Sequence, residues 1–273
     1  MNPALRNALL RGRRRPRNLG AGSPTIFRGD GYEFTELRQY VAGDDIRRVD
    51  WAATARAGAL QTRVVLEDVA LTLGAIIDDS PSMRLGRRRP LLASAHEAML
   101  AWYAAAFADD RCARITASGL VAPVGMRGYR SALVCANAPE SAQAMQLLKA
   151  CDVARAALPR GAALLVVSDF FDLSADSDRM LGDLCARFDC TALLAQDPWR
   201  NELPLGGFVA LEDAESGVQR RFFIGPKERR RYAEAVAERE AGLLRRFANA
   251  GWRTGVLDEA DGTHSLLRAF GLR

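Results

Sequence analysis

The sequence predicts an α/β protein built on a doubly wound, mostly parallel β-sheet, with an elaborated N-terminal segment. Two apolar runs, 71–77 and 162–167, have the length of strands and no polar alternation. Such runs suit strands of a sheet that is covered on both faces. Segments with strand and helix patterns also alternate along the chain, as in folds whose parallel strands are joined by helices. At 273 residues and 49% apolar composition, the chain can form one large core.

The other elements are expected in the following order. An amphipathic helix spans 90–107, and two short strands, 111–117 and 120–124, flank Gly119. Further helices are expected at 141–149, 152–157, 176–188, 227–249 and 263–270, and further strands at 190–195, 208–211, 219–223 and 252–257.

Residues 1–26 are expected to form a flexible basic arm, in which a short helix starts at Asn2-Pro3 and ends near Arg11. One domain over 27–273 follows. The arginines of the arm are Arg11, Arg13, Arg14, Arg15 and Arg17. Such an arm could bind nucleic acid or an anionic surface, or remain a solvated tail. No aromatic side chains are interleaved with these arginines, which favours the tail over a nucleic-acid-binding module.

Composition excludes several other classes. The cysteines form no C-x-x-C pair, which argues against a zinc ribbon and against a disulfide framework. No apolar run is long enough to span a membrane, and the first residues lack the apolar core of a secretion signal. We therefore expect a cytoplasmic protein.

The 28–68 segment is dense in charge of both signs. We expect a loop-rich collar, tied by arginine–carboxylate pairs, that packs on the domain and ends in an edge strand at 61–66. The same side chains could form a docking surface for a partner protein. The residues assigned to that surface are Arg38, Asp44, Asp45, Arg47, Asp50, Trp51 and Arg56.

Oxygen-bearing side chains follow both buried strands. Asp78, Ser80 and Ser82 come at alternate positions after 71–77, and Asp169 follows 162–167. The carboxyl ends of parallel strands form the edge at which α/β folds bind ligands. Carboxylates and hydroxyls are hard ligands, suited to Mg²⁺, Mn²⁺ or Ca²⁺. Two alternatives stay open: these residues cap the next helix, or they form a hydrogen-bonded network without a metal.

One longer pattern runs from Gly31 to Met83. It reads G-x-E-F-x-x-L-R-x-Y-x-x-G-D-D-x-R-x-x-D-W-x-x-T-A-R, then L-x-x-R-x-x-x-E, then D-x-S-x-S-M. This pattern closely resembles the bacterial family called domain of unknown function 58, and the resemblance covers residues 27–270. It implies a von Willebrand factor A-like domain and an association with MoxR-type AAA+ ATPases.

The resemblance also implies a metal-ion-dependent adhesion site. Ser80 and Ser82 would coordinate the ion through their hydroxyls, and Asp78 and Asp169 would act directly or through water. One position on the ion would stay open for a carboxylate from a partner protein. The family's threonine ligand precedes a helix. This chain has Cys151 there, which is a poor ligand for a hard cation.

A non-catalytic role is expected. Asp78 and Asp79 resemble the start of the haloacid-dehalogenase phosphatase signature, but Ser80 replaces its second aspartate. The sequence has no G-x-S-x-G motif and no nucleotide-binding loop. A protein-interaction domain that acts with a MoxR-type ATPase on client proteins is therefore expected, with no small-molecule substrate. A metal-dependent phosphoryl-transfer hydrolase is the alternative.

The residues after the serines are basic. Arg84, Arg87, Arg88 and Arg89 are expected to attract an acidic partner surface and to raise its association rate.

Overall fold

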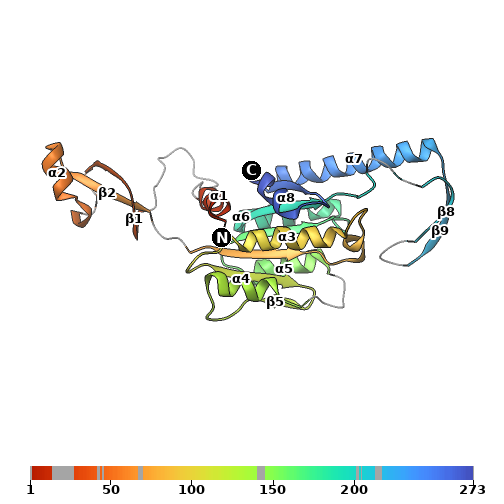
Figure 1. Cartoon of the computed structure of the whole chain (residues 1–273), viewed down its shortest axis with the longest axis horizontal. Helices are drawn as coiled ribbons and strands as arrows, with labels where there is room; N and C mark the ends of the chain where they lie inside the picture. The colour runs from red at the N-terminus through yellow and green to blue at the C-terminus, as the bar shows by residue number, and fades with distance from the viewer. Residues whose placement is uncertain are drawn as a thin grey trace. The chain divides into compact units, whose positions relative to one another are not determined.

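The computed structural model describes residues 2–13, 28–41, 44, 46–66, 70–139, 145–200, 203, 205–212 and 217–272. The chain divides into two compact units (Figure 1). We call Met1–Arg15 together with Leu71–Arg273 the sheet unit, and Pro16–Ala70 the inserted unit.

The described part of the sheet unit contains a six-stranded sheet in the order β10-β7-β6-β3-β4-β5. Its parallel strands are β3 (Thr72–Ile77), β4 (Arg111–Thr116), β6 (Ala163–Ser168), β7 (Asp189–Ala195) and β10 (Arg253–Leu257). The short strand β5 (Gly119–Val121) runs antiparallel to β4. The expected doubly wound, mostly parallel fold is confirmed.

The two apolar runs of the sequence are neighbouring parallel strands, as expected. Ile77 of β3 is in register with Val167 of β6. The chain leaves β3 toward β4 on one side and later returns to β6 on the other. The carboxyl ends of β3 and β6 therefore lie at the topological switch point of the sheet. Open α/β sheets bind ligands at this point.

Helices cover both faces of the sheet, which is why its central strands are apolar throughout. One apolar cluster includes residues of α1 (Pro3–Arg13), α3 (Leu91–Tyr103), α4 (Gly128–Ala136) and α8 (Gly262–Ala269). The other includes residues of α5 (Leu147–Ala157), α6 (Asp178–Arg187) and α7 (Pro226–Asn249). Along β3, Ala75 and Ile77 belong to the first cluster and Ile76 to the second. Figure 1 shows α3 and α5 in the sheet unit.

The short helix expected from Asn2-Pro3 to about Arg11 is confirmed as α1. It is packed into the sheet unit, so the expectation that this part of the arm is flexible is wrong. Leu5 and Leu9 are fully buried in the first apolar cluster. The Asn2 side chain accepts a hydrogen bond from the Leu5 N–H at 3.1 Å, and Arg6 forms an ion pair with the buried Asp110. Residues 14–26 of the expected arm lie outside the described residues.

Other elements differ from expectation in detail. Instead of two helices at 141–149 and 152–157, the described residues form the single helix α5, because nothing between Lys149 and Asp152 breaks a helix; residues 140–144 lie outside the described residues. Helix α4 was not expected. Strands β8 (Gly207–Glu212) and β9 (Gln219–Ile224) form an antiparallel ribbon, and short 3-10 helices occur at η2 (Pro81–Arg84) and η3 (Ala175–Ser177).

The inserted unit has more regular structure than the loop-rich collar that was expected. Strand β1 (Arg28–Gln39) pairs antiparallel with β2 (Gln61–Leu66), and η1 (Ile46–Arg48) and α2 (Trp51–Ala57) lie between them in the chain. The strand expected at 61–66 therefore exists, but it pairs with β1 and is not an edge of the main sheet. Pairing satisfies backbone groups that a loop would leave to water.

Candidate functional site

The candidate site begins where β3 and β6 end side by side. The Asp78 N–H donates to the Val167 carbonyl at 2.9 Å, which extends the pairing of the two strands by one residue. Asp78 is buried and Asp169 is half-buried. The structure thus places the two predicted carboxylates at the same edge of the sheet, at the switch point.

The Asp78 carboxylate is buried and hydrogen-bonded on both oxygens. Its Oδ1 accepts from the Ser80 N–H at 3.0 Å, and its Oδ2 accepts from the Ser168 hydroxyl at 2.6 Å. Burial raises the pKa of Asp78, the hydrogen bonds oppose that shift, and the nearby charge of Asp169 adds to it. A cation at this edge would stabilise the ionised form of Asp78.

The two predicted serines lie together. The hydroxyl oxygens of Ser80 and Ser82 are 3.0 Å apart, in a hydrogen bond in which either can be the donor. Ser80 precedes η2 but makes no side-chain capping bond to it, and α3 begins only at Leu91, after Pro90. The helix-capping alternative for Ser80 is therefore wrong. The metal site and the metal-free network remain.

Asp169 starts a loop that is held by α7. Its Oδ1 accepts from the Phe171 N–H at 2.9 Å, and its carbonyl accepts from Arg239 Nη2 at 2.8 Å. The Arg239 guanidinium lies over the Phe171 ring, 5.0 Å from the centroid. No sequence pattern had singled out Phe171 or Arg239.

Ser168 is a further site residue that the sequence analysis missed. Its hydroxyl donates to Asp78 and accepts from the Phe170 N–H at 2.8 Å, so it connects the end of β3 to the loop after β6. A signal was present, because Ser168 directly precedes Asp169 at the end of an apolar strand, the same position that singled out Asp78.

Cys151 was expected just before a helix, at the position of the family's threonine ligand. In the structure it lies inside α5. The side chain is 3% exposed and belongs to the second apolar cluster. Burial raises the pKa of its thiol to about 12, so the thiol stays protonated at neutral pH. A buried thiol does not provide the thiolate that binds metals, and we leave Cys151 out of the site.

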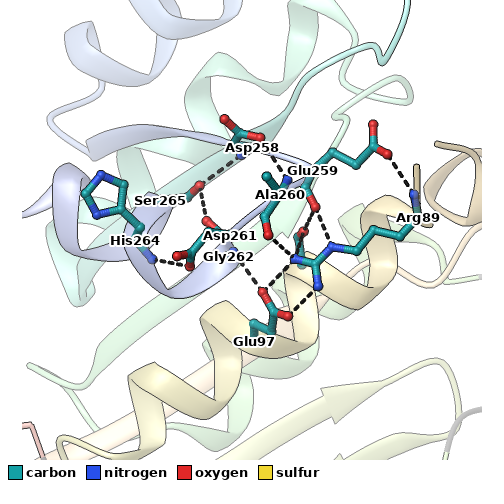
Figure 2. Close-up of polar contacts among 10 residues, drawn as sticks. Arg89, Glu97, Asp258, Glu259, Ala260, Asp261, Gly262, His264 and Ser265 are labelled. Atoms are coloured by element: carbon teal, nitrogen blue, oxygen red, sulfur yellow. Dashed lines mark hydrogen bonds and ion pairs between the residues drawn. The ribbon is translucent and has the colours of Figure 1, made fainter. Parts of the chain in front are cut away.

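The arginines near the site differ in their surroundings. Arg84, Arg87 and Arg88 are exposed, as a surface that attracts an acidic partner requires. Arg89 is not available for that role. Its guanidinium binds both carboxylate oxygens of Glu97 (Figure 2). It also binds the Ser94 hydroxyl at 2.8 Å.

Glu259, in the turn after β10, fixes the loop that joins η2 to α3. Its carboxylate accepts hydrogen bonds from the backbone N–H groups of Arg87, Arg88 and Arg89. Figure 2 shows Glu259 beside Arg89. These bonds lower the pKa of Glu259, although burial opposes them. Consecutive N–H groups on one anion form a nest. The loop next to the candidate site is therefore tied to the C-terminal part of the chain.

Two of the acidic residues assigned to docking, Asp44 and Asp50, have structural partners within the inserted unit. Asp44 is buried; its Oδ1 binds Arg38 Nη2 at 2.7 Å and its Oδ2 accepts from the Val41 N–H at 3.0 Å. Asp50 caps α2 by accepting from the Ala53 N–H at 2.9 Å and pairs with Arg63. The Ala53 and Arg63 bonds, in that order, lower the pKa of Asp50.

Three other residues assigned to docking lie at the surface. Trp51 is 66% exposed, and Arg47 and Arg56 are also exposed. Asp45 lies outside the described residues.

Any metal site here depends on hydroxyl ligands. No group of three or more His, Cys, Asp or Glu side chains that could hold a metal ion occurs in the described part of the chain. Within the same residues, no helix has the length and apolar character needed to cross a membrane.

Comparisons with known proteins give a family. The model of the family described as "Protein of unknown function DUF58" matches residues 36–242. Among curated relatives, the uncharacterized protein Rv1480 of Mycobacterium tuberculosis (strain ATCC 25618 / H37Rv) is 32% identical over 235 residues, which is 82% of this chain and 73% of that protein.

Solved structures with low sequence identity are also similar. A von Willebrand factor type A structure from Catenulispora acidiphila has a TM-score of 0.40 and 15% identity, covering 77% of this chain and 43% of that one. The conserved hypothetical protein BatB from Bacteroides thetaiotaomicron has a TM-score of 0.37 and 12% identity, covering 67% of this chain and 99% of that one.

Proposed function

This chain belongs to the DUF58 family, and we propose that it is a protein-interaction domain whose carboxyl edge binds a divalent cation and, through it, a carboxylate of a partner protein. One observation carries this proposal. The buried carboxylate of Asp78 lies at the switch point together with the paired hydroxyls of Ser80 and Ser82 and the carboxylate of Asp169.

The donor set fits a hard cation. Every candidate ligand is an oxygen, as Mg²⁺ and Ca²⁺ prefer. Asp78 and Asp169 would supply at most two negative charges, and the serines would supply neutral hydroxyls. A bound ion would therefore keep a strong affinity for a further carboxylate. Mg²⁺ usually keeps several waters, and a partner's aspartate or glutamate could displace one of them.

A binding role fits these residues better than catalysis. Ser80 has the place at which a phosphatase of the haloacid-dehalogenase type needs its second aspartate. Of the two histidines, His96 has its Nε2 3.5 Å from Arg114 and His264 lies in the first turn of α8. The pairing of His96 with Arg114 does not suit His96 to act as a general base at Asp78.

We also propose a partner for the inserted unit. The family resemblance suggests a MoxR-type AAA+ ATPase, and the inserted unit exposes Val41, Ile46 and Trp51 at 59%, 64% and 66%. Contiguous patches of exposed apolar side chains often mark protein contacts, and we propose that these three side chains contribute to such a patch. The same unit exposes Arg56, which would add a charged contact.

Calorimetry tests the metal site. Mg²⁺, Mn²⁺ and Ca²⁺ are titrated separately into the wild type, Asp78→Asn and Asp172→Asn. The Asp172 variant is the matched control, because it removes the same charge from an exposed position in the loop that Asp169 starts. We expect uptake by the wild type and the control, with a Kd in about the millimolar range because few hard ligands are available, and no uptake by Asp78→Asn.

The absence of ion uptake by the wild type would refute the metal site. Asp78, Ser80, Ser82 and Asp169 would then form the hydrogen-bonded network without a metal, which is the alternative given above. For the ATPase, co-expression with a MoxR-type partner is the test: the wild type should co-purify with it, and Trp51→Ser should not. Co-purification of Trp51→Ser at the wild-type level would remove the inserted unit from the contact.

A further inference from the structure

An exposed aromatic side chain lies beside the candidate metal ligands. Phe171 is 76% exposed, two residues after Asp169. Arg239 of α7 lies over its ring and also donates to the Asp169 carbonyl at 2.8 Å. The guanidinium of Arg239 on α7 thus contacts both the exposed ring of Phe171 and the backbone of the candidate ligand Asp169.

The backbone holds Phe171 in this position. Phe170 has a φ of +54°, which a residue with a side chain rarely adopts. Its ring is 2% exposed and packs edge-on against Phe247 at a centroid distance of 4.7 Å. Its N–H donates to Ser168. Because Phe170 is anchored inward, the next side chain is turned to the surface. Unusual backbone conformations of this kind are concentrated at functional sites.

We propose that Phe171 and Arg239 select the partner of the metal site: a protein segment in which an aspartate or glutamate is next to an apolar side chain. The inference rests on the proposed function, in which the ion takes the acidic side chain. The neighbouring apolar side chain packs on Phe171. Arg239 has N–H groups beyond the one that binds Asp169, and these can donate to the segment's carboxylate.

Charge supports an acidic occupant. Arg84, Arg87 and Arg88 are exposed in the segment that follows the serines, and Arg239 lies on the side of Asp169. A site with a bound cation and these arginines repels a basic segment and attracts an acidic one. A purely polar acidic segment would leave Phe171 unused, so the combination of apolar and acidic side chains is the chemistry that matches both features.

Immobilised synthetic peptides test the selectivity. Each peptide carries one aspartate in a Gly/Ser background, with leucine or serine on either side of it. In millimolar Mg²⁺, we expect the wild type to prefer the leucine-flanked peptides by about tenfold, equivalent to about 1.4 kcal/mol. Phe171→Ser should reduce that preference to about onefold and leave Mg²⁺ uptake unchanged. Phe208→Ser is the matched control, because Phe208 is 88% exposed on another element, β8.

The outcomes separate the inference from the proposed function. If calorimetry shows no metal uptake, or if peptide binding persists in EDTA, the proposed function fails. If Mg²⁺ is taken up but the wild type shows no preference for leucine, or if Phe171→Ser keeps the preference, the proposed function stands and the selectivity role of Phe171 is wrong. An equal loss in Phe208→Ser also overturns it.

Discussion

Gly262→Ala is the substitution whose effect is most directly defined by the structure. Gly262 is the first residue of α8 and packs against the backbone of α3 (Figure 2). A Cβ at this position would lie 1.7 Å from the Ser94 carbonyl oxygen, 2.6 Å from its carbon and 3.0 Å from the Ala98 nitrogen. All three atoms are backbone atoms of a helix, so no side chain can rotate away.

The expected cost has two parts. Overpacking a tight site typically costs about 1–3 kcal/mol, and this overlap belongs at the upper end. Moving α8 away would also break the hydrogen bond from the Gly262 N–H to Glu97, 3.0 Å long, which contributes about 1.5–3 kcal/mol because the acceptor is charged. Together the two parts should lower the free energy of unfolding of Gly262→Ala by about 4.5–6 kcal/mol.

Urea unfolding measured by circular dichroism tests this value. Gly182→Ala is the control, because Gly182 lies within α6 and a Cβ there meets no atom within 4 Å. That variant should be more stable than the wild type by about 0.5–1 kcal/mol, from helix propensity. If Gly262→Ala unfolds within about 0.5 kcal/mol of the wild type, the range of ordinary surface substitutions, the close packing of α8 on α3 is wrong.

Three further predictions concern single side chains. Burial raises the pKa of Glu240 above 4.5, against the attraction of Arg200. The folded state therefore loses stability as pH rises from 4.5 through the folded pKa. Urea unfolding at a series of pH values should show the stability of Glu240→Gln rising relative to the wild type over that interval, whereas a falling difference would mean that Arg200 dominates. Trp102 is fully buried and donates to the Gly74 carbonyl at 3.1 Å; Trp102→Phe should lower the free energy of unfolding by about 1–3 kcal/mol, and an unchanged urea midpoint would contradict this. Cys151→Ser places a hydroxyl in an apolar cluster and should lower the free energy of unfolding by about 1–3 kcal/mol. Calorimetry should show unchanged Mg²⁺ uptake, and altered uptake would mean that Cys151 belongs to the metal site.

Sequence patterns predicted the central sheet because burial on both faces leaves a local signature. A strand such as β3 is apolar at successive positions because its residues alternate between the two apolar clusters. Helix α1 leaves a weaker signature. Its 11 residues are too few for a stable isolated helix, and its stability comes from the burial of Leu5 and Leu9, a tertiary contact that composition does not reveal.

The residues of the candidate site also differ in whether a local sequence pattern reveals them. Asp78, Ser80 and Ser82 could be found because they follow one strand within five residues. Arg239 could not, because it lies 70 residues from Asp169 in the chain. Its acceptor is a backbone carbonyl, a group that every residue has, so no residue type marks the position at which an arginine will bind.

Helix α7 holds the segment from Asp169 to Ser174, which follows β6 in the candidate site. Arg239 and Arg246 are seven residues apart, about two helical turns, and therefore lie on one face of the helix. Arg239 donates to the Asp169 carbonyl, and Arg246 donates to the carbonyls of Leu173 and Ser174. The segment from Asp169 to Ser174 is thus held at both ends by one rigid helix. Because these acceptors are backbone atoms, the segment can change its sequence without losing the contacts, whereas a shift of α7 must move Asp169 relative to Asp78.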